Sequence, residues 1–495
     1  MKIRFVWLVL GVVFILSSVA ITLVEFNHFS GRPSVFPTGS TIASLPVGGL
    51  TPAEAQERLV VFFSLPLVLD IEGATVHADP VELGFSFDPE VLIAEAMDQL
   101  DTGNFWGYLW GNTSNHDPID VPFTAAVDEI LILDYLTETI QPRYTQPELP
   151  HRPVAWTTNF IPGEPGQQLE KDRAVAEIRA ALLSPETHNA SIQIVESGQV
   201  ETRKDILQAF LRHNINWSGF DDLVEIYLES MATGESLHFA VQRGELIEPD
   251  VAYTAASTIK IPIMISVLRR TPEPTPETVV SLLEQMIALS ENPPADTLMS
   301  NYIDEVRGPL MVSEDLAALG MENTFLAGYF YLGAPLLQRY ETPANNRTDI
   351  FLNPDIYNQV VPSEIGQLLA AIYNCADDGS GLLTETFPGE ITREKCQLMI
   401  DILAGNQIGL LIEAGVSYQA TVAHKHGWVT DLDGLIRFMS DVGIVFSPGG
   451  DFVLNVFIHD AVRLNFDQGN RVIARIAQTV YNFYNLEEQA HWWFD

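Results

Sequence analysis

The stretch Tyr253-Thr254-Ala255-Ala256-Ser257-Thr258-Ile259-Lys260 runs directly into the apolar segment Ile261-Pro262-Ile263-Met264-Ile265-Ser266-Val267-Leu268. This segment predicts a buried helix whose first turn includes Ser257, because Pro262 is tolerated only near the start of a helix. A serine and a lysine three positions apart lie on one helical face, within reach of each other. A lysine in an apolar setting loses its proton more readily, and its free amine can accept the serine proton. Ser257 is therefore a candidate nucleophile and Lys260 its candidate base.

Two further motifs follow this pair along the chain. A predicted helix over 276–288 ends in the loop Leu289-Ser290-Glu291-Asn292, and Val422-Ala423-His424-Lys425-His426-Gly427-Trp428 lies far downstream on a predicted strand. A lone S-x-x-K pattern is weak, since many helices contain it as an N-cap serine followed by a surface lysine. Three ordered motifs, each on a suitable element, are a stronger signal.

The order S-x-x-K, S-x-N, K-x-G resembles that of the active-site serine penicillin-recognising enzymes, which include penicillin-binding proteins and class A β-lactamases. Residues 220–488 resemble the class A-related serine hydrolases along their whole length. The resemblance implies that Ser257 accepts the acyl group and that Lys260 is the general base. It also implies that Ser290 passes a proton towards the leaving nitrogen, which Lys425 polarises.

The same resemblance implies a set of substrate-binding groups. Asn292 would contact Lys260 and the substrate amide. The backbone N–H groups of Ser257 and Trp428 would form an oxyanion hole that stabilises the charge developing on the attacked carbonyl. Gly427 would permit the close backbone approach that such a strand requires.

His426 occupies a position where the family usually has a threonine or serine that helps to bind a substrate carboxylate. An imidazole can still donate a hydrogen bond, so we expect altered recognition at His426. His424 is the residue before Lys425, and alternate residues of a strand share a face, so both histidines should point the same way. Two histidines alone make a poor metal site, and neither a metal nor another cofactor is expected.

The segment Arg339-Tyr340-Glu341-Thr342-Pro343-Ala344-Asn345 matches the R-x-E-x-x-x-N spacing of the class A omega loop. In that family the glutamate and the asparagine hold the water that hydrolyses the acyl-enzyme, which implies this role for Glu341 and Asn345. The family has a proline directly after the glutamate, whereas Pro343 comes one residue later. The alternative is a solvated loop carboxylate with no catalytic role.

The pattern around these motifs predicts an α+β domain over 199–495. Expected strands cover 224–229, 237–241, 422–428, 436–446 and 452–460, and an amphipathic helix over 472–484 closes the chain. The resulting antiparallel sheet of the β-lactamase/transpeptidase type would be covered by helices, with a helical insert between the second and third strands. The substrate cleft should lie where the insert meets the sheet. Cys375 and Cys396 are expected either to pair or to remain as two buried thiols.

Two small α+β domains are expected before this one, over 41–115 and 116–198. Thr51-Pro52-Ala53-Glu54 reads as a capping box that starts a helix. The stretch resembles the YoaR-like peptidoglycan-binding domain, on the segments 47–51 with 53–59 and 162–166 with Leu169. The resemblance implies contact with peptidoglycan, and the alternative is a pair of spacers.

The N-terminal segment 1–27 predicts a membrane anchor, followed by a linker over 28–40. Residues 5–24 carry no charge, and 20 residues of helix span about 30 Å, the thickness of a hydrocarbon core. Lys2 and Arg4 would stay in the cytoplasm, which makes the protein single-pass with an extracytoplasmic catalytic domain. A signal peptide removed after Ser18-Val19-Ala20 is the alternative. Either option places the cysteines in an oxidising compartment.

The composition excludes one class of partner. The chain of 495 residues carries 26 Lys+Arg against 65 Asp+Glu, a net charge of −39, whereas nucleic-acid binding needs a basic surface. The leading hypothesis is thus an exported, membrane-anchored β-lactamase that forms an acyl-Ser257 intermediate. The alternatives are a D-alanyl-D-alanine carboxypeptidase acting on wall peptides and a non-catalytic peptidoglycan-binding protein.

Overall fold

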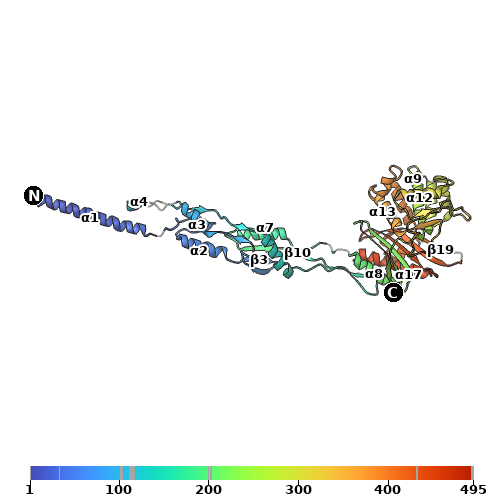
Figure 1. The fold of residues 1–495 in the computed structure, drawn as a ribbon, viewed down its shortest axis with the longest axis horizontal. Helices are drawn as coiled ribbons and strands as arrows, with labels where there is room; N and C mark the ends of the chain where they lie inside the picture. The colour runs from blue at the N-terminus through green and yellow to red at the C-terminus, as the bar shows by residue number, and fades with distance from the viewer. Residues whose placement is uncertain are drawn as a thin grey trace. The chain divides into compact units, whose positions relative to one another are not determined.

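The computed structural model describes residues 2–32, 34–100, 104–110, 117–198, 200, 203–430 and 433–491. The chain divides into two compact units, Met1–Leu149 with Glu164–Val200, and Pro150–Gly163 with Glu201–Asp495 (Figure 1). Each unit therefore consists of two separate stretches of sequence. The chain leaves the first unit at Leu149, contributes Pro150–Gly163 to the second unit, and returns to the first unit at Glu164. It enters the second unit again at Glu201.

The first unit begins with helix α1 (Lys2–Ser30), which has the length and hydropathy of a membrane span or a signal sequence. Its other helices are α2 (Pro52–Phe63), α3 (Pro89–Asp98), α4 (Phe105–Leu109), α5 (Glu129–Tyr135), the π-helical turn Leu136–Ile140, α6 (Gln141–Tyr144) and α7 (Lys171–Leu182). Its strands are β1 (Thr41–Ile42), β2 (Leu45–Pro46), β3 (Leu67–Ile71), β4 (Ala74–Ala78), β5 (Phe85–Ser86), β6 (Asp120–Val121), β7 (Ala126–Val127), β10 (Gln167–Leu169), β11 (Asn189–Ile192) and β12 (Ile194–Glu196). Thr51 and Glu54 form the expected capping box at the start of α2.

The predicted division into separate domains over 41–115 and 116–198 is not what the structure contains. Strand β1 pairs with β6, β3 pairs with β11, and β5 pairs with β7, so each pair joins the two halves. One hydrophobic cluster also takes residues from both halves, from Phe36 to Ile192. Two-residue strands leave no alternating pattern in the sequence, which is why this interleaving was not predicted. The expected boundary itself falls at 111–116, outside the described residues.

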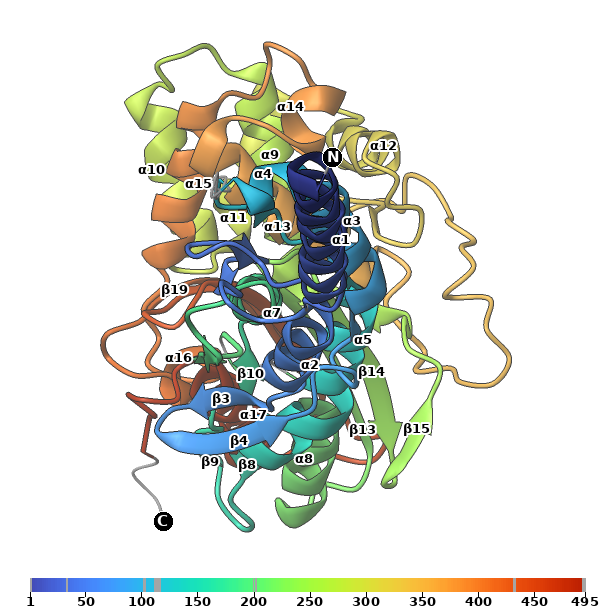
Figure 2. The same cartoon turned by 90° about the vertical axis from the view of Figure 1, so that its left-hand side faces the viewer.

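The second unit is built on a six-stranded sheet in the order β15-β14-β13-β21-β20-β19, in which every neighbouring pair is antiparallel. The strands are β13 (Leu223–Ser230), β14 (Ser236–Gln242), β15 (Glu245–Ile247), β19 (Thr421–Thr430), β20 (Ile436–Phe446) and β21 (Phe452–His459). Five of them are the predicted ones. The short edge strand β15, visible beside β14 in Figure 2, was not expected.

Helices cover both faces of this sheet (Figure 1). One face packs against the long insert between β15 and β19, and the other against α8 (Lys204–Trp217), α16 (Ile412–Gly415) and α17 (Phe466–Tyr484). The insert contains α9 (Lys260–Arg270), α10 (Glu277–Ile287), α11 (Asn292–Tyr302), α12 (Gly308–Ala318), α13 (Pro362–Asp378), α14 (Leu382–Thr386) and α15 (Arg393–Ala404). Alternate residues of β13 divide between the two faces: Tyr227 packs against the insert, and Ile226 and Leu228 against α8 and α17.

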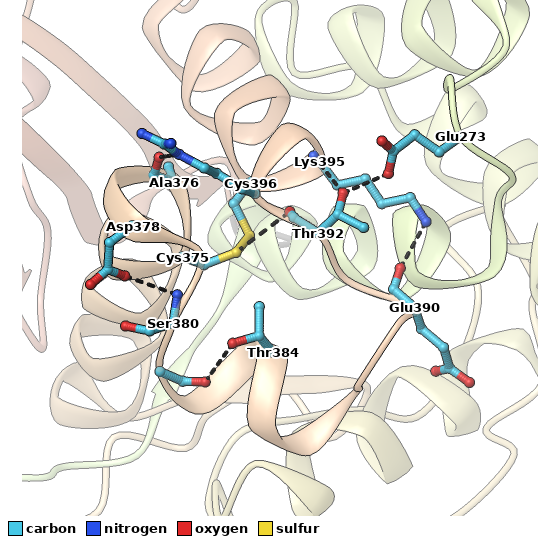
Figure 3. Close-up of a disulfide and its surroundings, with 12 residues drawn as sticks. Glu273, Cys375, Ala376, Asp378, Ser380, Thr384, Glu390, Thr392, Lys395 and Cys396 are labelled. Carbon is cyan, nitrogen blue, oxygen red and sulfur yellow. Dashed lines mark hydrogen bonds between the residues drawn. A yellow bond between two sulfur atoms is a disulfide. The ribbon is translucent and has the colours of Figure 1, made fainter.

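Two further features fix the insert. The short strands β16 (Tyr253–Thr254), β18 (Asn358–Val360) and β17 (Phe325–Leu326) form a small antiparallel sheet. Cys375 on α13 and Cys396 on α15 form a disulfide with a Cα–Cα distance of 5.8 Å (Figure 3). Of the two alternatives left open for the cysteines, the structure contains the paired one.

The second unit also takes in the hairpin of β8 (Arg152–Pro153) and β9 (Phe160–Ile161), which the sequence assigned to the preceding domain. Phe160 is 2% exposed and packs against Phe210 of α8 and Phe483 of α17, with ring centroids 5.1 and 5.5 Å away. The expected domain start at residue 199 therefore leaves out a segment of this unit's core.

Candidate active site

Ser257 lies on a tight turn that joins β16 to α9. The predicted single α-helix is in fact a 3₁₀ turn, Ala256–Ile259, followed by α9 from Lys260. Ala256 has a φ of +48°, in the left-handed region that costs a non-glycine residue about 1–3 kcal/mol. The side chain of Asn358 on β18 holds this turn, since its Oδ1 accepts the N–H of Ala256 at 2.9 Å. The backbone next to Ser257 is thus fixed by a residue 102 positions away.

Lys260 is fully buried and faces Ser257. Its Nζ donates to Ser257 Oγ at 3.2 Å and to the carbonyl oxygen of Ser290 at 2.7 Å. Burial lowers the pKa of Lys260 to about 8. A neutral amine is therefore accessible near neutral pH at hydrogen-bonding distance from the serine oxygen, as a general base requires.

Ser290 and Lys425 complete a chain of hydrogen bonds to Ser257. Ser290 lies in the loop between α10 and α11 with a φ of +58°, and its Oγ donates to Ser257 Oγ at 3.0 Å. Lys425 Nζ on β19 donates to Ser290 Oγ at 2.9 Å. Burial, and then the nearby charge of Lys260, lower the pKa of Lys425 to about 7. The four predicted catalytic side chains therefore meet, although they come from four separate segments.

A cavity of about 480 Å³ opens at Ser257. Among the predicted substrate-binding residues, Asn292 and Trp428 line it. Gly427 is needed for close approach, because a Cβ there would lie 2.9 Å from Ser440 Oγ and 3.1 Å from the carbonyl oxygen of Ala255. The side chain of Asn292, at the start of α11, makes no hydrogen bond to Lys260 within the described part of the chain.

His426 does not face this cavity. Side chains alternate along β19, so His424 and His426 share the face opposite Lys425, and both contact Asn406. The His426 ring stacks on Trp428 with centroids 4.4 Å apart, and burial lowers its pKa to about 2. His424 Nδ1 bonds to Asp441 at 2.9 Å. The His426 ring thus lies behind Trp428, and its expected role in binding a carboxylate stays a prediction.

Neither member of the predicted omega-loop pair lines the Ser257 cavity. Glu341 is exposed and is absent from the residues that line the cavity. Asn345 turns into its own loop, where its Oδ1 accepts the N–H of Thr342 at 2.8 Å and its Nδ2 donates to Gln359 Oε1 at 3.0 Å. The R-x-E-x-x-x-N spacing is matched, but both side chains are absent from the lining of the Ser257 cavity, and their role stays a prediction.

Asp355 is the one carboxylate among the described residues that line the Ser257 cavity. Its carboxylate accepts the N–H of Tyr357 at 2.9 Å and an N–H of the Asn358 side chain at 3.3 Å. Burial raises its pKa. Asn358 thus links Asp355 to the turn that carries Ser257. Sequence reasoning missed both residues, because they lie in an irregular loop and a three-residue strand without periodicity.

An aromatic segment, Tyr329–Gly333, forms part of the cavity wall. The ring of Phe330 lies over Lys260, with its centroid 5.7 Å from Nζ. Asp296 Oδ1 accepts the N–H of Phe330 at 2.8 Å and so holds this segment against α11. Phe330 contributes to the burial that favours the neutral amine.

Comparison with known proteins gives one family match. Residues 271–484 match the model of the Beta-lactamase enzyme family. No curated protein matches the chain.

Several solved structures are similar at low identity. PBP-A is 17% identical with a TM-score of 0.39, covering 57% of this chain and 96% of that one. A β-lactamase from Sphaerobacter thermophilus is 19% identical with a TM-score of 0.40, covering 57% and 98%. A β-lactamase from Chitinophaga pinensis is 18% identical with a TM-score of 0.40, covering 56% and 98%. Nothing about substrate follows from these likenesses.

The match leaves Ser257 and Lys260 outside its range, while Ser290 and Lys425 fall within it. The strand pairing shows an antiparallel sheet with a helical insert, and this observation does not depend on the family match. The second unit thus has a β-lactamase-like α+β fold, and its residues 271–484 are similar to the Beta-lactamase enzyme family.

Proposed function

We propose that the protein is an extracytoplasmic serine hydrolase of the β-lactamase type, anchored by α1, which opens β-lactams through an acyl-Ser257 intermediate. The observation that supports this most is the hydrogen-bonded chain Lys260–Ser257–Ser290–Lys425, with both amines buried. A binding module has no need for two buried lysines of lowered pKa around one serine. The family match over 271–484 supports the same reading.

In the acylation step the neutral amine of Lys260 takes the proton of Ser257 Oγ while that oxygen attacks the carbonyl carbon. The N–H groups of Ser257 and Trp428 bind the developing oxyanion. The bond from the carbonyl carbon to nitrogen then breaks, and the leaving nitrogen takes the proton of Ser290 Oγ, which Lys425 polarises. The proton that Lys260 removed from Ser257 replaces the one that Ser290 Oγ has given up. The product is an ester on Ser257.

In the hydrolysis step we assign the water-activating role to Asp355 in place of Glu341. A water in the cavity attacks the ester carbonyl and gives one proton to the Asp355 carboxylate. The ester bond to Ser257 Oγ breaks and this oxygen takes the proton from Asp355, which becomes a carboxylate again. The second proton of the water leaves with the carboxylic acid product. A general base must lie within reach of the water it activates, and Asp355 lines the Ser257 cavity whereas Glu341 does not.

The decisive experiment is mass spectrometry of the purified protein after incubation with penicillins, with a chromogenic cephalosporin as a parallel assay of turnover. We expect an adduct on Ser257 or accumulation of the opened product, and neither in Ser257→Ala. A wild-type protein that forms no adduct and no product, although it is folded by circular dichroism, would overturn the proposal.

A D-alanyl-D-alanine peptidase is the second candidate. The apolar ring of Phe330 beside Lys260 favours it, because such a ring limits the water near the acyl-enzyme. In that case penicillin would label Ser257 stably without turnover, and wall peptides ending in D-alanyl-D-alanine would be cleaved.

The two carboxylates provide a matched pair of variants. Asp355→Asn should slow hydrolysis of the acyl-enzyme by roughly 10²–10⁴-fold, the usual contribution of a general base, while leaving acylation in place. Glu341→Gln is the control and should leave turnover unchanged. Stopped-flow acylation and the lifetime of the adduct measure the two steps separately. Loss of turnover in Glu341→Gln alone would restore the role first expected for that residue.

A further inference from the structure

Helix α4 packs against the last turns of α1 within the first unit. The ring of Phe105 lies 5.2 Å from that of Phe26 and 5.7 Å from that of Phe29. Tyr108 stacks near Phe29 at 5.5 Å and donates its hydroxyl proton to Glu25 Oε2 at 3.0 Å. A five-residue helix is thus held on α1 by both ring contacts and a hydrogen bond.

The depth of this contact follows from the sequence of α1. The uncharged stretch ends at Val24, and Phe26 and Phe29 lie about 3 and 8 Å further along the axis at 1.5 Å per residue. The polar layer on each side of a hydrocarbon core is about 5–8 Å thick. If α1 spans a bilayer with residues 5–24 in the core, α4 lies in this layer.

The side chains that α4 leaves exposed suit that layer. Trp106 on α4 is 61% exposed and Trp110, the residue that caps its C-terminus, is 81% exposed, whereas Phe105 and Tyr108 pack against α1. Tryptophan is enriched at membrane–water interfaces, where its apolar ring and its N–H group meet different surroundings. The guanidinium of Arg32 lies 3.9 Å from the Tyr108 ring centroid and places a positive charge beside α4.

We infer that α4 is a second membrane-contacting segment, packed beside α1, and that Trp106 and Trp110 insert into the outer interfacial layer of the bilayer. The inference rests on the proposed anchoring by α1. It adds a second contact with the lipid beside that of α1. The exposed rings of Trp106 and Trp110 then contact the lipid headgroup region rather than another protein. A second attachment point restrains the tilt and rotation of α1 where the chain leaves the membrane.

The test uses the full chain in phosphatidylcholine vesicles, with an environment-sensitive fluorophore on a single introduced cysteine. The native cysteines are paired and do not compete for the label. The labelled variants are Trp106→Cys, Trp110→Cys, Val12→Cys in the middle of α1, and Ala180→Cys as the control. Ala180 is exposed on α7, which packs against α5 and β11. Quenching is measured with lipids brominated near the headgroup or deep in the chains.

Labels at 106 and 110 should lose roughly half of their emission with the shallow quencher and less with the deep one, as expected for side chains at the headgroup boundary. The label at 12 should respond to the deep quencher and the label at 180 to neither. Quenching at 12 without quenching at 106 and 110 would overturn the membrane contact of α4 while leaving the anchoring by α1 intact. No quenching at 12 would refute the anchor itself.

Discussion

Lys260 and Lys425 are two amines buried around one pair of serine hydroxyls, and burial lowers the pKa of both, to about 8 and about 7. A solvated lysine has a pKa of about 10.4 and is almost fully charged at neutral pH. Burial of Lys260 therefore makes a neutral amine available as the base in the proposed step.

The first prediction concerns the pH dependence of acylation. In the proposed step Lys260 acts as the free amine, so the rate constant for acylation should rise by up to tenfold per pH unit as Lys260 loses its proton below about pH 8. Stopped-flow measurement of acylation by a penicillin between about pH 6 and 9 checks this limb. Lys260→Arg keeps the charge and cannot supply the amine, so it should lower the rate by roughly 10²–10⁴-fold. A flat profile in the wild-type protein would contradict the role of Lys260.

Site residues were predictable where the family motif also sets the backbone direction. Ser257, Lys260, Ser290 and Lys425 fall on a turn, a helix start, a loop and a strand, and these local placements were sufficient to bring them together. Glu341 and Asn345 depended on the path of a long irregular loop, which residue spacing does not determine. His426 is not among the residues that line the Ser257 cavity, although Trp428, which shares its face of the strand, is.

At the scale of elements, the disulfide joins α13 to α15 and closes a loop over a sequence separation of 21 residues. Closing a loop of this length is worth about 3 kcal/mol, through the reduced freedom of the unfolded chain. We expect thermal unfolding of the wild-type protein to shift down by several degrees in the presence of a reductant.

The matched control is the double variant Cys375→Ala with Cys396→Ala. Its midpoint should already be lowered and should not respond to the reductant. Identical wild-type midpoints with and without reductant would show that the crosslink adds nothing to stability, or that it is not formed in the protein tested.

Long elements were found from the sequence and short ones were not. Strands β20 and β21 and helix α17 have enough residues for their periodicity to be read. Strands β16 and β18 contain two and three residues, yet β18 carries Asn358, which holds the Ser257 turn. The residue that fixes the backbone beside Ser257 thus lies in a strand too short to show a hydrophobic periodicity in the sequence.

At the scale of the whole molecule, the second unit is completed by the hairpin 150–163, which precedes the last part of the first unit in the sequence. The contact depends on Phe160, buried between Phe210 and Phe483. Phe160→Ala should destabilise the second unit by about 3–5 kcal/mol, the usual cost of removing a buried phenylalanine.

The neighbouring Ile161 is 47% exposed, so Ile161→Ala is a suitable control with an expected effect below about 1 kcal/mol. Denaturant unfolding followed through penicillin labelling of Ser257 would report on the second unit in particular. Equal midpoints for the two variants would show that the hairpin is not part of the core of this unit.

The central pair of the catalytic sheet joins β13, near the start of the second unit, to β21, close to its C-terminal end. During synthesis the middle of this sheet stays open until β21 has been made, after the whole insert between β15 and β19. A chain that stops before β21 would expose two unpaired strand edges and no finished nucleophile site. Under the proposed function, acylation of Ser257 would therefore appear only once β21 has joined the sheet.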